Sequence, residues 1–112
     1  MMNDWAKELP MAVTITDKNG IIIYMNDKSI ETFAKYGGEK IIGTELNSWH
    51  NANSVEIINA MINENKTNSY TISKNGVKKM IHQTPYYDGG EYAGLVEFSI
   101  IIPEDMPHFD RG

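Results

Sequence analysis

The chain has 112 residues, a formal net charge of −5 and no cysteine. This length predicts a single domain, and the acidic balance argues against nucleic acid or an anionic membrane surface as a partner. The absence of cysteine excludes disulfides, zinc thiolate sites and iron–sulfur clusters. Because the sequence also lacks a signal peptide and an apolar run of membrane-spanning length, we expect a soluble, cytoplasmic protein.

The first quarter of the chain predicts a short N-terminal segment followed by a β-hairpin. Residues 1–10 contain Trp5 and Leu9 in a short helical turn that Pro10 ends. Residues 11–16 are rich in β-branched side chains and predict a strand. Asp-Lys-Asn-Gly at 17–20 is a strong turn signal, so residues 21–25 are expected to form the second strand of the hairpin.

The middle of the chain predicts helices. Asn26 or Asp27 can cap a first helix, which Gly37-Gly38 ends. Residues 39–42 and 44–50 predict short helical or irregular pieces, and a clearer helix follows from about 55 to 64. The apolar faces of the two longer helices are expected at Ile30, Phe33 and Ala34, and at Val55, Ile58, Met61 and Ile62.

The last third predicts β-structure. Strands are expected over 68–73, 77–86 and 91–102, separated by turns at Asn75-Gly76 and Asp88-Gly89-Gly90. A polar tail, 103–112, follows. The order β-β-α-α-α-β-β-β with sequential hairpins predicts an α+β fold, in which helices pack on one face of a five-stranded antiparallel sheet.

Three stretches, in this order and at this spacing, resemble the PAS domain family. Residues 15–26 are similar to the opening hairpin of that family, a strand ending in Asp, a Gly turn, a second strand and then Asn. Residues 33–43, with Tyr36-Gly37 and Ile42-Gly43, resemble the stretch that follows it. Residues 85–97 resemble the closing hairpin, with Pro, an acidic-Gly turn and a final strand. The resemblance covers about residues 11–102, so 1–10 is expected to form a cap or dimerisation segment and 103–112 a tail.

The resemblance also has departures with functional consequences. The usual terminal Asp-Ile-Thr is replaced by Ser99-Ile100-Ile101-Ile102-Pro103, so the usual outlet into a signalling helix is missing. Since the chain has no cysteine, the covalent flavin adduct and the thioester-linked chromophore of the photosensory members are excluded. The closing residues 102–109 look more like small stand-alone PAS proteins.

The resemblance implies a ligand site between the helices and the inner face of the sheet. Alternation along 77–86 divides the strand into two faces, one with Lys78, Met80, His82, Thr84 and Tyr86, the other with Val77, Lys79, Ile81 and Gln83. Alternation alone leaves open which face points inward. The first set is polar and aromatic and suits a pocket, so we expect His82, Met80 and Tyr86 to contact a ligand.

Further candidate site residues come from neighbouring segments. Glu97 would be costly to bury unpaired, so it either points outward or accepts a hydrogen bond from a ligand. Asn26 caps the first helix and can tie it to the hairpin. Trp49 is a packing or stacking residue, and His50 is the one candidate axial ligand for a b-type haem, although the following helix contains no histidine.

No reaction type emerges from the sequence. The three histidines show no metal-ligand spacing, and no Gly-rich phosphate loop opens a helix. We therefore expect a non-enzymatic sensory module in signal transduction that binds an unknown small molecule and acts through a homodimer, by way of Trp5 and Leu9, or through a signalling partner. The alternatives are a ligand-free interaction scaffold and, remotely, a small isomerase-like enzyme that uses His82 with Glu97 as its acid–base pair.

Overall fold

The computed structural model describes residues 4–46 and 52–112, and the five strands in these ranges form one antiparallel sheet. The spatial order of the strands is β2-β1-β5-β4-β3. The predicted fold class is therefore confirmed. The strands are β1 (Ala12–Thr16), β2 (Ile22–Met25), β3 (Asn68–Lys74), β4 (Val77–Asp88) and β5 (Glu91–Ile101).

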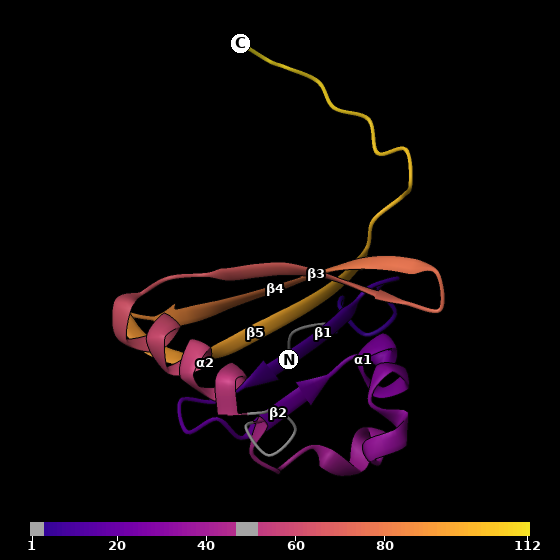
Figure 1. Cartoon of the computed structure of the whole chain (residues 1–112). Helices are drawn as coiled ribbons and strands as arrows, with labels where there is room; N and C mark the ends of the chain where they lie inside the picture. The colour runs from indigo at the N-terminus through magenta and orange to yellow at the C-terminus, as the bar shows by residue number, and fades with distance from the viewer. Residues whose placement is uncertain (1–3, 47–51) are drawn as a thin grey trace.

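The helices lie on one side of the sheet, as Figure 1 shows. They are α1 (Asp27–Thr32), the 3₁₀ turns η1 (Ala34–Tyr36) and η2 (Gly38–Ile41), and α2 (Ala52–Glu64). The helix α1 is shorter than its apolar pattern suggests, since the chain tightens into η1 and leaves Ala34 exposed rather than on a buried face. The helix α2 begins at Ala52, three residues before the predicted start.

Two apolar clusters hold the helices against the sheet. The first joins β2 to the turns that follow α1, through Ile22, Met25, Ile41 and Leu46. The second joins α2 to β5, through Ile58, Met61 and Leu95. The periodicity of α2 predicts Ile58 and Met61 as buried positions, and this is confirmed because each is 3% exposed.

Asn26 ties the N-terminal segment, β1 and α1 together. Its Oδ1 accepts hydrogen bonds from the backbone N–H of Val13 (2.9 Å) and of Ser29 (3.0 Å), and the second of these bonds caps α1 as expected. Its Nδ2 donates to the carbonyls of Ala6 (2.9 Å) and Met11 (2.8 Å). Asn26 is 1% exposed, so its amide works as a buried junction between three segments.

The part of the chain that the structure describes contains no helix long and apolar enough to cross a membrane.

Candidate functional site

The register of the strands decides which face of β4 points toward the helices. Leu95 packs against α2 and is paired with Pro85. Since side chains alternate along a strand, Gln83 and Ile81 share the face of Pro85, and Glu97 shares the face of Leu95. Thr14, the β1 partner of Glu97, contacts Ser29 of α1 through its hydroxyl at 2.5 Å, which confirms the assignment from the other end of the sheet.

A polar row crosses the helix-facing side of β3, β4 and β5. Asn68 is paired with Gln83, and Gln83 is paired with Glu97. The Asn68 amide donates to Gln83 Oε1 at 2.9 Å, and the Gln83 amide donates to Glu97 Oε2 at 2.9 Å. Gln83, at the centre, is 4% exposed. The amides orient one another, so the row presents a fixed pattern of donors and a carboxylate acceptor.

The electrostatic effect of the row reaches Tyr70, the β3 partner of Ile81. Burial raises the pKa of the Tyr70 hydroxyl above its usual value, and the negative charge of Glu97 raises this pKa further. A tyrosine held neutral in this way offers a hydroxyl donor beside the carboxylate acceptor. The surrounding surface is apolar, because Ile81 is buried and Ile72 is 40% exposed on the same face.

Three predicted ligand contacts lie on the opposite face of the sheet. His82 and Met80 of β4 pair with Phe98 and Ile100, away from the helices. The ring of His82 is engaged by β3, since its Nδ1 is 2.5 Å from the hydroxyl of Ser69. Tyr86 shares this face and donates its hydroxyl to the carbonyl of Thr16 at 3.0 Å. The polar, aromatic set that suits a pocket therefore does not face the helix layer.

The acid–base pair of the enzyme hypothesis is not assembled. His82 and Glu97 belong to adjacent strands, but His82 is paired with Phe98 and Glu97 with Gln83. The two side chains consequently project from opposite faces of the sheet, and no substrate could contact both. The remote isomerase-like hypothesis loses the one pair on which it depended.

Two candidate residues lie outside the described residues, Trp49 and His50. Among the residues that are described, no group of three or more histidine, aspartate or glutamate side chains is arranged to hold a metal ion. Of the seven site residues predicted from the sequence, Glu97 alone is found facing the helix layer from the central strands of the described sheet. Asn26 lies at the junction of α1 and β1.

The sequence reasoning missed Gln83 and Asn68. Both are visible as polar residues within strands, but neither position is unusual until the register is known. A usable signal is the alternation of Ile81, Gln83 and Pro85, which places an amide between two side chains typical of an interior. That signal cannot be used without the partner strand.

The fold is shared with solved structures of low sequence identity. No protein-family model matches the sequence, and no curated protein matches it. Among solved structures, the PAS domain of histidine kinase ThkA is 16% identical, with a TM-score of 0.65, and 80% of this chain and 97% of that chain are covered.

The names of two further similar structures mention a ligand. The Aer2 receptor from Vibrio cholerae, described as a dual PAS-heme oxygen sensor, is 17% identical with a TM-score of 0.63, covering 83% of this chain and 95% of that chain. VqmA bound to DPO is 18% identical with a TM-score of 0.68, covering 87% of this chain and 55% of that chain. At these identities the likeness establishes the fold, and it confirms the PAS-like α+β architecture.

Proposed function

We propose that this chain is a sensory module that binds a small molecule on the helix-facing side of its sheet, over Asn68, Gln83 and Glu97. The observation that carries the proposal is this polar row, because its central residue Gln83 is 4% exposed and burying a polar group costs more free energy than burying an apolar one. A ligand with N–H or O–H groups could bond to the carboxylate. The names of two structural neighbours, which mention haem and DPO, support a ligand in this type of fold.

The chemistry of the row favours a polar organic ligand over haem. Iron in a porphyrin needs a strong axial donor such as imidazole. His82 lies on the opposite face of the sheet, and His50, the candidate axial ligand, lies outside the described residues. The three side chains of the row are amides and a carboxylate, which select by hydrogen bonding. We expect no Soret band in the absorption spectrum of the freshly purified protein.

The proposal is tested by native mass spectrometry of the freshly purified protein and of two neighbouring variants. Gln83→Leu keeps the approximate volume and removes the central amide, whereas His82→Ala changes the next residue on the opposite face. We expect a co-purified small molecule that is lost in Gln83→Leu and kept in His82→Ala. Retention by Gln83→Leu together with loss from His82→Ala would move the site to the other face and refute the proposal.

A ligand-free interaction scaffold is the second candidate, and one observation favours it. Among the described residues, every buried side-chain nitrogen and oxygen has a hydrogen-bond partner within the protein. The row can therefore be satisfied without a ligand, as a structural network. A bare chain mass in the native spectrum, unchanged after incubation with cell extract metabolites, would support the scaffold.

Both functions need a surface that contacts another protein, either to transmit a ligand signal or to act as a scaffold. Trp5 supports a role for the N-terminal segment in this, because it is 70% exposed while the neighbouring Ala6 is buried. The segment is held in place, since Lys7 forms an ion pair with Asp27 at 3.1 Å and Tyr24 donates to Asp4 at 2.6 Å. An exposed tryptophan on a segment that is bonded to the body of the domain is typical of a protein contact site.

A further inference from the structure

The two edges of the sheet differ in what covers them. The edge formed by β2 is covered by residues 43–46, because the Ile22 N–H donates to the Thr44 carbonyl at 2.9 Å and the Gly43 N–H donates to the Ile22 carbonyl at 2.8 Å. Within the part of the chain that the structure describes, the edge formed by β3 has no such cover, since β3 pairs with β4 alone. Every residue of β3 after Asn68 is exposed. An uncovered edge strand is a template for pairing with another strand.

The hydrogen bonds of β4 determine which backbone groups β3 presents at this edge. In an antiparallel sheet the N–H and C=O of one residue point to the same neighbouring strand, and this direction alternates along the strand. The carbonyl of Lys78 accepts a hydrogen bond at 2.9 Å from the N–H of Ile102, which directly follows β5, so Lys78 faces β5 and Lys79 faces β3. Lys79 is paired with Ile72, whose N–H and C=O therefore point to β4. The backbone groups of the alternate residues point out of the sheet edge, at Ser69, Thr71 and Ser73.

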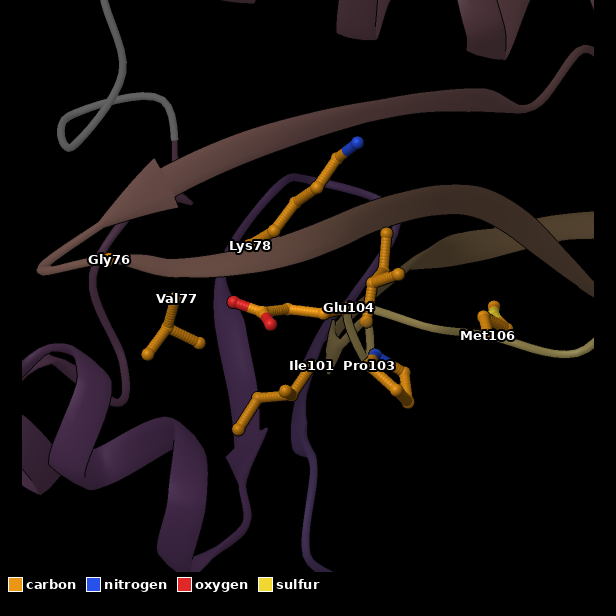
Figure 2. A pocket seen from close by; sticks show the side chains of 8 residues that line it. Gly76, Val77, Lys78, Ile101, Pro103, Glu104 and Met106 are labelled. Atoms are coloured by element: carbon orange, nitrogen blue, oxygen red, sulfur yellow. The ribbon is translucent and has the colours of Figure 1, made fainter.

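The side chains of β3 alternate between the two faces of the sheet. Figure 2 shows such an alternation at the hairpin turn, where Val77 and Ile101 point to one side of the strands and Lys78 points to the other. By their pairing with β4, Tyr70 and Ile72 lie on the same face as Val77, toward the helices. Tyr70 is 43% exposed and Ile72 is 40% exposed. The edge therefore has uncovered apolar side chains on one face and small hydroxyl side chains on the other.

The strand β3 lacks the features that protect edge strands from pairing. Natural proteins place prolines, bulges or charged side chains on such strands, or keep them very short. The seven residues of β3 pair with β4 in one unbroken register and include no proline. Their one charged side chain is Lys74, at the end of the strand. The middle of β3 is consequently open to a partner strand.

We propose that β3 pairs with β3 of a second copy of this chain, antiparallel and centred on Thr71, so that the two sheets join into one. In this register Thr71 lies opposite Thr71 of the second copy, and Ser69 lies opposite Ser73. All the backbone groups that point out of the edge are then paired. Because each contact occurs twice, the interface is isologous and closes as a two-fold dimer. The dimer does not depend on whether the row of Asn68, Gln83 and Glu97 binds a ligand.

The side chains of β3 are self-complementary in this register, which favours a second copy over another extended peptide. Tyr70 lies opposite Ile72 of the second copy in a non-hydrogen-bonded pair, where side chains approach most closely. An aromatic side chain opposite a β-branched one is a favourable cross-strand pair. Lys74 lies opposite Asn68, so no like charges face each other. A register centred on Tyr70 would instead place Lys74 opposite Lys66.

A proline at the centre of β3 tests the edge. Thr71→Pro removes an N–H that points away from β4, so the ladder between β3 and β4 keeps its hydrogen bonds. Thr71→Val is the matched control, because it keeps the N–H and the β-branched shape. By sedimentation equilibrium we expect a wild-type dimer with a micromolar dissociation constant, since an edge contact is small. The dissociation constant should rise at least about tenfold in Thr71→Pro and stay near the wild-type value in Thr71→Val.

Charged residues at the same position test the register and do not rely on the proline variant. Position 71 faces itself across the proposed two-fold axis, so Thr71→Lys and Thr71→Glu each place like charges opposite one another. A 1:1 mixture of these two variants pairs opposite charges. We expect the dissociation constant of each variant alone to rise at least about tenfold, and the mixture to form a dimer with one copy of each, identified by its mass in native mass spectrometry.

Each of four results would overturn the proposal. The first is a wild-type chain that stays monomeric at high micromolar concentration. The second is a Thr71→Pro variant that keeps its sheet by circular dichroism and dimerises as the wild type does. The third is a mixture of the charged variants with no preference for the mixed dimer, which would refute the register. The fourth is a dimer that Trp5→Ala abolishes and Thr71→Lys leaves intact, which would assign the interface to the N-terminal segment.

Discussion

At the scale of single residues, Gly94 shows how close two strands approach. A Cβ added there would lie 2.0 Å from the Thr16 carbonyl oxygen and 2.8 Å from a ring carbon of Tyr86. The hydroxyl of Tyr86 reaches across to the same carbonyl, and the Leu95 N–H donates to the Thr16 hydroxyl at 3.2 Å. This contact lies where the β1–β2 register shifts, between Ile15 and Thr16. A side chain at 94 would separate strands that these bonds hold together.

We therefore expect Gly94→Ala to lower the free energy of unfolding by about 3 kcal/mol, since the added methyl meets backbone and must displace it. Urea unfolding followed by circular dichroism measures the change. Gly89→Ala is the matched control, because position 89 has φ of +60° and a Cβ added there would meet no atom within 4 Å. The control should cost about 1 kcal/mol from backbone strain alone. Equal losses in the two variants would contradict the packing argument.

At the scale of elements, β4 determines the site, since its two faces have different roles. The helix-facing row of Gln83 is linked to Glu97 and to Tyr70 of β3, whereas His82 bonds to Ser69 on the outer face. One consequence is electrostatic and concerns the pKa of Tyr70. Because burial and then Glu97 raise the pKa of Tyr70, its proton is held more tightly in the folded chain than in the unfolded chain. The stability associated with neutral Tyr70 is present below the ordinary tyrosine pKa and is lost as pH rises above it.

Replacing Glu97 by glutamine should lower the pKa of Tyr70 toward the usual tyrosine value without reaching it, because burial is the larger cause and remains. Absorption titration of tyrosinate, with Tyr70→Phe to identify the signal among the six tyrosines, measures the shift. Alkaline unfolding should also begin at higher pH in Glu97→Gln. Glu104→Gln, in the C-terminal segment, is the control and should change neither. An unaltered Tyr70 titration would show that Glu97 does not affect the pKa of Tyr70, and would argue against the row as a binding site.

At the scale of the whole molecule, the two terminal segments differ in how they contact the rest of the domain. The N-terminal segment is bonded to it through Asn26, Tyr24 and Asp27. Residues 103–112 leave the end of β5 and run away from the sheet (Figure 1), with Met106 57% exposed and Phe109 68% exposed. The N-terminal segment therefore contributes to the stability of the domain, whereas residues 103–112 contribute little to it.

Deleting residues 1–10 should lower the free energy of unfolding by about 2 kcal/mol, since the amide of Asn26 loses the carbonyl of Ala6 inside the protein. Deleting 103–112 should leave the unfolding midpoint unchanged, because Met106 and Phe109 are 57% and 68% exposed and lose few contacts. Chemical denaturation of both deletions makes the comparison. Destabilisation by the second deletion would show that residues 103–112 pack on the sheet.

The elements and their order could be predicted from the sequence because the signals are local. Asn-Gly and Asp-Gly turns, the cap at Asn26 and the periodicity of Ile58 and Met61 act over a few residues, and each is found close to its predicted place. The end of α1 is less predictable from such signals. Its tightening into a 3₁₀ turn, which exposes Ala34, depends on how Phe33 packs against the first apolar cluster.

The candidate site required the tertiary structure. Alternation along β4 separates His82 from Gln83 but does not tell which of them faces the helices, because each face is defined by what packs on it. That choice is made by distant residues, Leu95 under α2 and Thr14 under α1. The sequence by itself determined a cysteine-free, acidic domain with a PAS-like order of elements. The tertiary structure decided that the polar row of Asn68, Gln83 and Glu97, and not His82, faces the helices, because pairing between strands far apart in the sequence orients the side chains of the sheet.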